Sequence, residues 1–157
     1  MPGGLIDRSI GDGLITVRPF GSSDQIALLR GRDSEFYRFL GEGSAEPAPA
    51  GCIWLGTTPV GWIDFDDERV WLGENEVNVG YGVFPQHRGN GYATRALRLL
   101  CRYLEGQTPP LQPTLLIDPA NSPSLAVARR AGFEHTADIE GEMLFRPMAL
   151  GSGNGGR

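Results

Sequence analysis

The 157-residue sequence predicts one α/β domain built on a mixed sheet with helices on its faces. Three observations lead to this prediction. Strand-like and helix-like segments alternate in the order β-α-α-β-β-β-α-β-α-β-β. A glycine-interrupted strand, 76–84, runs almost directly into an amphipathic helix that starts near Gly91. Further along, a short apolar strand, 113–120, precedes a second helix with clear start and stop signals.

Seven segments have the pattern of strands. "LITVRPF" (14–20) alternates apolar and polar residues with a period of two, whereas 113–120 is a short apolar run typical of a buried strand. Gly80 and Gly82 interrupt the segment 76–84, and glycine inside a strand often marks a bulge or the close approach of a ligand. The expected strands are 14–20, 52–57, 60–68, 76–84, 113–120, 133–141 and 142–148, with the last two forming a hairpin.

Four segments have helical signals, and they are 22–33, 34–40, 91–105 and 121–132. The third shows apolar residues at helical spacing, with arginines on another face that is typical of a solvated surface. In the fourth, Ser122 is expected as the N-cap, Pro123 as the first helical residue and Gly132 as the C-cap.

The two ends of the chain differ in composition from its middle. Residues 1–13 are rich in glycine and 150–157 read "LGSGNGGR", so both are expected to be flexible around a single domain at 14–149. The segment 1–13 has no basic stretch followed by an apolar core, so no secretory signal is expected. Two isolated cysteines, Cys52 and Cys101, are typical of small apolar core residues in a reducing cytoplasm.

Charge and residue usage exclude several function classes. The formal charge of −5 disfavours general binding to nucleic acid or to an anionic membrane and favours a cationic ligand. No run of eighteen apolar residues is present, so no membrane span is expected. All 14 basic residues are arginine, which excludes a phosphate loop ending in Gly-Lys-Ser/Thr and any lysine Schiff base. No residue cluster has metal-ligand spacing, so no metal is expected.

The stretch "FPQHRGNGYATRAL" (84–97) places two glycines where a strand passes into a helix. Either the glycines form a tight turn, or they expose backbone N–H groups to an anion at the helix N-terminus. A dinucleotide fingerprint would need a third small residue, and Thr94 stands at that position. The segment also lies late in the chain, after strands that look antiparallel, which disfavours a nicotinamide or flavin fold.

Two motifs together carry a resemblance to a known family. "QHRGNG" (86–91) has the form Gln-x-x-Gly-x-Gly, and "DPANSPSLAVARRAGF" (118–133) follows about thirty residues downstream. With this separation and strand–helix order, the chain from about Ile15 to Met148 resembles the acetyl-CoA-dependent N-acetyltransferases of the GNAT superfamily. The branch that includes ribosomal-protein N-terminal acetyltransferases is the most similar. The resemblance implies a mostly antiparallel sheet of about seven strands, about four flanking helices, and a splayed parallel strand pair that binds the cofactor.

The resemblance also implies which residues bind acetyl-CoA. The pyrophosphate would be held by the loop between His87 and Thr94, with a charge-assisted contact from Arg88. The preceding strand is bulged in relatives, and the pantetheine would pair with its backbone, much like an added strand. The expected cofactor-binding residues are Tyr81, Val83, Phe84, His87, Arg88, Gly89, Asn90, Gly91, Tyr92, Ala93, Thr94, Asn121 and Ser124.

The catalytic residues are less well specified. Many relatives protonate the leaving thiolate with a tyrosine where this chain has Ala128, so Ser124 becomes the expected acid, ahead of Tyr81 and Tyr92. Asn121 is expected beside the pantetheine or acetyl region, with a helix-turn role as the alternative. The expected base is Glu76, because bases of the superfamily often lie on the central strand. The carboxylates of the hairpin segment are further candidates to attract a cationic amine, and they are Asp64, Asp66, Asp67 and Glu68.

The resemblance predicts an enzyme that transfers an acetyl group from acetyl-CoA to a primary amine within a ternary complex. The amine acceptor is left open between a protein N-terminus and small molecules. The oligomeric state is left open between a monomer and a homodimer. Two alternatives stay open at this point. One is the transfer of a different acyl group, and the other is a non-catalytic module that binds acetyl-CoA.

Overall fold

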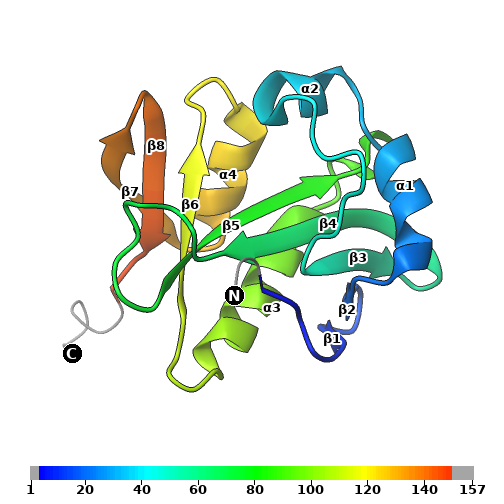
Figure 1. Ribbon diagram of the computed structural model, residues 1–157, viewed down its shortest axis with the longest axis horizontal. Helices are drawn as coiled ribbons and strands as arrows, with labels where there is room; N and C mark the ends of the chain where they lie inside the picture. The colour runs from blue at the N-terminus through cyan, green and yellow to red at the C-terminus, as the bar shows by residue number, and fades with distance from the viewer. Residues whose placement is uncertain (1–3, 150–157) are drawn as a thin grey trace.

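The computed structural model describes residues 4–149, and the strands in this range form one eight-stranded sheet (Figure 1). Its order is β1-β2-β3-β4-β5-β6-β8-β7, and every neighbouring pair is antiparallel except β5 and β6. The mixed, mostly antiparallel fold is therefore confirmed. The strands are β1 (Ile10–Gly11), β2 (Thr16–Pro19), β3 (Gly51–Leu55), β4 (Thr58–Asp66), β5 (Glu76–Val83), β6 (Gln112–Ile117), β7 (Phe133–Ile139) and β8 (Glu142–Pro147).

Four α-helices cover the two faces of the sheet (Figure 1). They are α1 (Gln25–Arg30), α2 (Ser34–Leu40), α3 (Tyr92–Glu105) and α4 (Ser122–Arg130). Helices α3 and α4 pack on one face, and α1 packs on the other, against β4. Two helices begin at a side-chain cap: Asp33 accepts from the N–H of Phe36 at 3.0 Å, and Asn121 accepts from the N–H of Ser124 at 3.3 Å. The predicted N-cap at Ser122 was therefore one residue too late.

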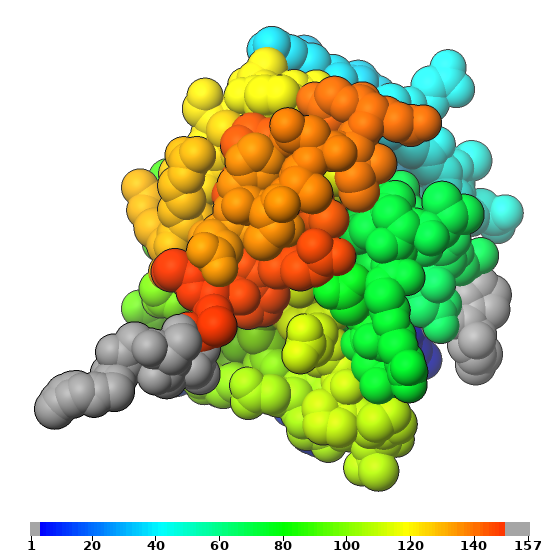
Figure 2. All heavy atoms as spheres, turned by 90° about the vertical axis from the view of Figure 1, so that its left-hand side faces the viewer, coloured from blue at the N-terminus to red at the C-terminus, as the bar shows by residue number. Residues whose placement is uncertain are grey.

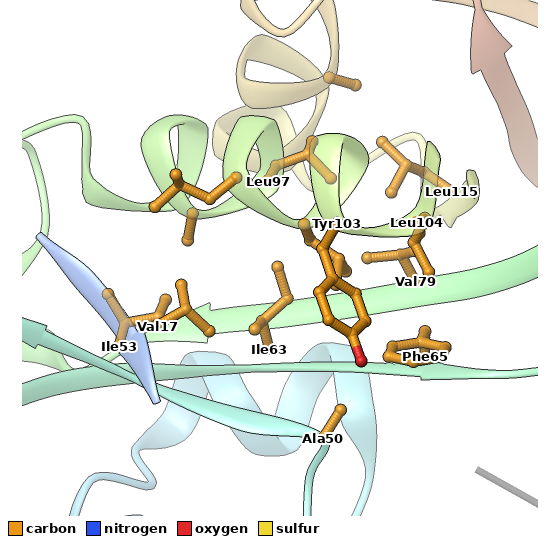
Figure 3. Close-up of a cluster of buried hydrophobic side chains, with 14 of the residues drawn as sticks. Val17, Ala50, Ile53, Ile63, Phe65, Val79, Leu97, Tyr103, Leu104 and Leu115 are labelled. Atoms are coloured by element: carbon orange, nitrogen blue, oxygen red, sulfur yellow. The ribbon is translucent and has the colours of Figure 1, made fainter. Parts of the chain in front are cut away.

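The main core lies between α3 and the sheet (Figure 3). Leu97, Leu100 and Leu104 are fully buried on α3, as their helical spacing predicts, and they pack with Ile63 and Val79 of the central strands. A smaller cluster on the opposite face joins Leu28 of α1 to Cys52 and Phe84. Burial raises the pKa of both cysteine thiols to about 12, which leaves them as unreactive packing groups.

The parallel pair separates after three residues. Residues 76–78 of β5 pair with 112–114 of β6, after which the two strands diverge (Figure 1). From Leu115 onward β6 pairs with β8 instead, opposite Phe145. The register between β4 and β5 runs without a shift from Asn78 to Val83, so the expected bulge in β5 is absent. The splay arises because β6 leaves β5 for β8.

The N-terminal segment differs from the expectation of a flexible 1–13. Within 4–13, Ile6 is fully buried, the N–H of Gly4 donates to the carbonyl of Phe65 at 2.9 Å, and β1 adds an eighth strand to the sheet. The expected flexible tail at 150–157 lies outside the described residues. Across 4–149 there is no helix with the length and apolar character needed to cross a bilayer.

Candidate active site

A cavity of about 610 Å³ opens where β5 and β6 diverge. It is bounded by the second half of β5, by the loop before α3, by the start of α4, and by α2. Two of the predicted site residues, Glu76 and Asn90, do not line it. The structure brings the other twelve together, and they are Tyr81, Val83, Phe84, His87, Arg88, Gly89, Gly91, Tyr92, Ala93, Thr94, Asn121 and Ser124.

The N-terminus of α3 faces this cavity without a side-chain cap. Gly89 and Gly91 have φ angles of +82° and +78°, a left-handed conformation that favours glycine. A Cβ atom on either residue would meet nothing within 4 Å, so both backbones border open space. The first intrahelical hydrogen bond runs from the N–H of Arg95 to the carbonyl of Gly91, so the earlier N–H groups have no acceptor in the helix. This end of α3 has the features of an anion site.

A buried hydroxyl in the first turn of α3 lacks a partner. Thr94 is 6% exposed and lines the cavity, yet its Oγ1 makes no hydrogen bond within the described residues. An unsatisfied buried polar atom is rare in a native structure and calls for a ligand or a water as partner. Asn90 stabilises the loop from outside, because its side-chain amide donates to the carbonyl of His87 at 3.0 Å.

The second half of β5 presents backbone groups to the gap. The N–H of Phe84 donates to Val60 of β4 at 2.8 Å, and the backbone groups of successive strand residues point to opposite edges. Those of Val83 and Tyr81 therefore face the side from which β6 has departed. Phe84 was also expected to offer its backbone to the pantetheine. Its N–H is instead bonded to β4, and its buried ring packs near Leu28.

Arg88 does not reach toward the helix N-terminus, as was expected of a phosphate ligand. Its guanidinium makes two hydrogen bonds to Asp33, at 2.7 and 3.1 Å, and its Nε donates to the carbonyl of Val83 at 3.0 Å. Glu35 of α2 lies 3.4 Å away. The hydrogen bond from Arg88 holds the pKa of Asp33 below its ordinary value, so the pair is charged at neutral pH. Arg88 thus ties the loop to the capped start of α2.

Helix α4 contributes two polar residues to the cavity. The side-chain oxygen of Asn121 is occupied by capping α4, which is the alternative role foreseen for it, while the residue still lines the cavity. Ser124 also lines it, and no hydrogen bond to its hydroxyl is found within the described residues. Burial raises the pKa of Tyr81 to about 12, and its hydroxyl donates to the carbonyl of Ser124 at 3.4 Å, so its proton is already held by the backbone of α4. Ala128 is fully buried and adds no polar group.

Glu76 lies away from the cavity, and the structure contradicts its prediction as the base. Its carboxylate accepts from Arg146 of β8 at 2.7 and 3.1 Å and from the N–H of Gly73 at 2.8 Å. The hydrogen bond from Arg146 lowers the pKa of Glu76, which makes the carboxylate a weaker base. Figure 2 shows the end of the molecule where the strands β7 and β8, in orange and red, adjoin the green segment before β5.

Trp62 of β4 was not singled out from the sequence, although it lines the cavity. It stands directly opposite Gly82 in the β4–β5 register. A Cβ atom on Gly82 would lie 2.6 Å from the indole nitrogen, so glycine is required there to seat the ring. The same cavity is lined by the carboxylates of Glu35, Asp118 and Glu142, which no sequence pattern had indicated. Across 4–149 no group of three or more potential metal ligands comes together.

Comparisons with known proteins agree with this geometry. Residues 33–134 match the family model of the acetyltransferase (GNAT) domain. The chain belongs to the GNAT acetyltransferase family. A comparison with curated protein sequences finds no match.

Solved structures similar to this GNAT acetyltransferase share its fold at low sequence identity. A GNAT-family acetyltransferase from Bacillus anthracis has a TM-score of 0.73 at 20% identity, over 87% of this chain and 96% of that one. The microcin C7 self-immunity acetyltransferase MccE, in complex with acetyl-CoA and AMP, has a TM-score of 0.72 at 16% identity, over 93% and 99%. The ribosomal-protein acetyltransferase RimL has a TM-score of 0.73 at 14% identity, over 93% and 100%.

Proposed function

We propose that this acyltransferase moves the acetyl group of acetyl-CoA directly to a primary amine while both substrates are bound. One observation carries the proposal. A single cavity combines an uncapped helix N-terminus with an unpaired strand edge. The first suits the two negative charges of a pyrophosphate, and the second suits the amide groups of a pantetheine arm.

The residues at the start of α3 would hold the pyrophosphate. Gly89 and Gly91 leave room beside the backbone, and the N–H groups of Tyr92, Ala93 and Thr94 precede the first intrahelical bond. The unpaired Thr94 hydroxyl supplies a further donor. Arg88 supports this loop through Asp33 and does not serve as a phosphate ligand.

The edge of β5 would orient the pantetheine. The backbone groups of Tyr81 and Val83 face the gap left by β6, although the Val83 carbonyl already accepts from Arg88. A free N–H on this edge would also polarise the thioester carbonyl, which is a hydrogen-bond contribution of the kind that stabilises acyl-transfer transition states.

We assign Ser124 to pass a proton from the attacking amine to the leaving thiolate: the hydroxyl donates its proton to sulfur and takes the proton that nitrogen loses, so the serine ends neutral. Its hydroxyl lines the same cavity, and helix capping does not occupy it, because Asn121 supplies the cap. Serine is a weak acid, so positioning of the two substrates carries most of the rate enhancement in this proposal.

An amine-panel screen tests the function. The full chain is incubated with acetyl-CoA and single amines, free CoA thiol is followed, and the products are identified by mass spectrometry. Acetylation of at least one primary amine, dependent on the protein, is expected. Binding of acetyl-CoA without turnover on any amine or peptide N-terminus would instead establish a non-catalytic cofactor-binding module.

A further inference from the structure

A second cavity, of about 230 Å³, adjoins the first on the face of the sheet covered by α1. It lies beneath the loop between α2 and β3, and its walls are mostly apolar. Phe36, Leu40 and Trp62 line both cavities, so these three side chains form the partition between them. Leu28 and Pro47 add to the apolar wall, and Asp64 is the acidic residue of the lining.

Asp64 is a shielded carboxylate without a cationic partner. Its Oδ1 accepts from the N–H of Ala50 at 2.9 Å, but no arginine or histidine within residues 4–149 lies in salt-bridge distance of it. Burial raises the pKa of Asp64 against the lowering effect of hydrogen bonds from the backbone of Ala50 and Phe65. Partly removing a carboxylate from water without a counter-ion is unfavourable, so the position of Asp64 suits a cation brought by a ligand.

The other carboxylates of this hairpin do not share that position. Asp66 accepts from the N–H of Glu68 at 3.1 Å and lies 3.7 Å from Arg69. Asp67 and Glu68 are exposed. Of the four carboxylates considered from the sequence, Asp64 is therefore the one that the fold places in a cavity.

The partition between the two cavities is thin beside Asp64. Gly80 stands opposite Asp64 in the β4–β5 register and lines the first cavity. Because a Cβ atom there would meet nothing nearer than the Trp62 ring at 3.8 Å, β5 puts no side chain between Asp64 and the splayed edge. The ring of Trp62 is the side chain nearest to this position, and the face of an indole is suited to a cation.

Arg32 is the basic residue in the lining of the second cavity, and it is held at the far side. Its guanidinium lies 4.8 Å from the ring centroid of Phe36 and donates to the carbonyl of Glu42 at 3.4 Å and of Ser44 at 2.6 Å. These bonds tie Arg32 to the loop between α2 and β3. At the end of the cavity formed by β4, Asp64 is therefore the charged side chain of the lining.

We propose that the second cavity is the acceptor site and binds a protonated primary amine attached to an apolar group of a few carbon atoms. The ammonium group lies at Asp64, beside the Trp62 partition, and the apolar group contacts Leu28 and Phe36. The inference rests on the proposed acetyl transfer, because it explains how an amine reaches the splayed edge of β5. The same chemistry is offered by a free amine and by the first residue of a peptide.

Paired probes test the charge requirement without relying on turnover. Benzylamine, which is protonated at pH 7, and benzyl alcohol, which is neutral and of similar shape, are titrated into the full chain with saturating CoA, and binding is followed by NMR. We expect benzylamine to bind at least tenfold more tightly than benzyl alcohol. In Asp64→Asn this preference should vanish, while the amide oxygen can still accept from Ala50. Asp66→Asn, on the same strand and face, is the matched control and should keep the preference.

The outcomes separate this inference from the proposed function. Equal affinity for the two probes in the unaltered protein, or a preference that survives Asp64→Asn, would overturn the acceptor site even if acetyl transfer occurs. A charge preference that depends on Asp64, in a protein that acetylates no amine, would support the site and overturn the function. Titration with a short peptide that has an apolar first residue, with its N-terminus either free or acetylated, then tells the two sources apart. Tighter binding of the free peptide than of the acetylated one points to protein N-termini. Equal affinity for the two peptides points to small amines.

Discussion

Residues 76–78 of β5 pair with β6, whereas residues 79–83 pair with β4 alone and leave the other edge open. Asn78 is the point of exchange, since it pairs with both Asp66 and Thr114. Around the first half, side chains are engaged with each other: Glu76 binds Arg146, and the Thr114 hydroxyl donates to the Val77 carbonyl at 3.0 Å. Around the second half, glycines and the unpaired hydroxyl of Thr94 border a cavity.

The contrast shows how one strand can serve stability and function separately. The pairing with β6 and the ion pair of Glu76 with Arg146 fix the position of the strand in its first half, so the other edge of the second half can remain unpaired without unfolding. If this division is right, variants near the second half should change catalysis or binding, and variants near the first half should change stability.

The largest effect is expected for Ser124→Ala, beside the open half. Loss of the hydroxyl should lower kcat by tenfold to a hundredfold, or about 1.4–2.7 kcal/mol, because thiolate protonation is then left to water. The affinity for acetyl-CoA should change little. Steady-state kinetics and calorimetry on one preparation measure both quantities.

Ser122→Ala is the matched control, since Ser122 is an exposed residue of the same helix that does not line the cavity. It should retain full kcat. Full kcat in Ser124→Ala as well would leave positioning of the substrates as the catalytic device of this enzyme.

A smaller effect is expected for Gly91→Val, where the open half passes into α3. A side chain there would occupy the space beside the helix N-terminus, and CoA should bind at least tenfold more weakly, a loss of about 1.4 kcal/mol. Valine is also strained at a φ of +78°, so part of the effect falls on stability.

Gly56→Val separates the two causes. Gly56 has a φ of +61° in the turn between β3 and β4 and likewise has no atom within 4 Å of its Cβ position. This variant should lose stability and retain CoA affinity. Unchanged CoA binding in a folded Gly91→Val protein would contradict the anion site at α3.

Local patterns were enough to predict most elements of the fold and the loop at the centre of the site. Alternation and helical spacing act over a few residues, so β5, α3 and α4 lie close to their expected ranges. The ordered segment 4–13 escaped prediction because its two-residue strand β1 gives no periodic signal, and the segment is held by contacts such as that of the buried Ile6 with the core.

The parts of the site that could not be predicted depend on contacts between distant residues. Arg88 looked like a phosphate ligand until the fold placed Asp33, 55 residues earlier, against its guanidinium. Gly82 was interpreted as the mark of a bulge or of a ligand nearby, whereas the ring of Trp62 on the neighbouring strand requires it. The carboxylate of Glu76, which was expected to act as the base, is bound instead by Arg146, 70 residues away. No local pattern carries such pairings.

The smallest effect is expected at the first half of β5, for Glu76→Gln. Arg146 lowers the pKa of Glu76 below its ordinary value of 4.5, so the ionised carboxylate stabilises the folded state. That contribution is complete above the unfolded-state pKa and is lost as the pH falls through the lower folded-state pKa. With Arg146 partly exposed, we expect Glu76→Gln to cost only about 1 kcal/mol of unfolding free energy at pH 7. The cost should shrink steadily below pH 4.5.

Urea unfolding of both proteins between pH 7 and pH 3 measures this difference, with Glu74→Gln as the control, because Glu74 is exposed and has no salt bridge within the described residues. The value of kcat at pH 7 decides what the comparison of the two halves means. If Glu76 serves only the fold, Glu76→Gln should leave kcat within about twofold, since its carboxylate lies outside the cavity. A loss of kcat comparable to that of Ser124→Ala, in a protein that is still folded, would show that the paired half of β5 also takes part in catalysis, and the division proposed here would fail.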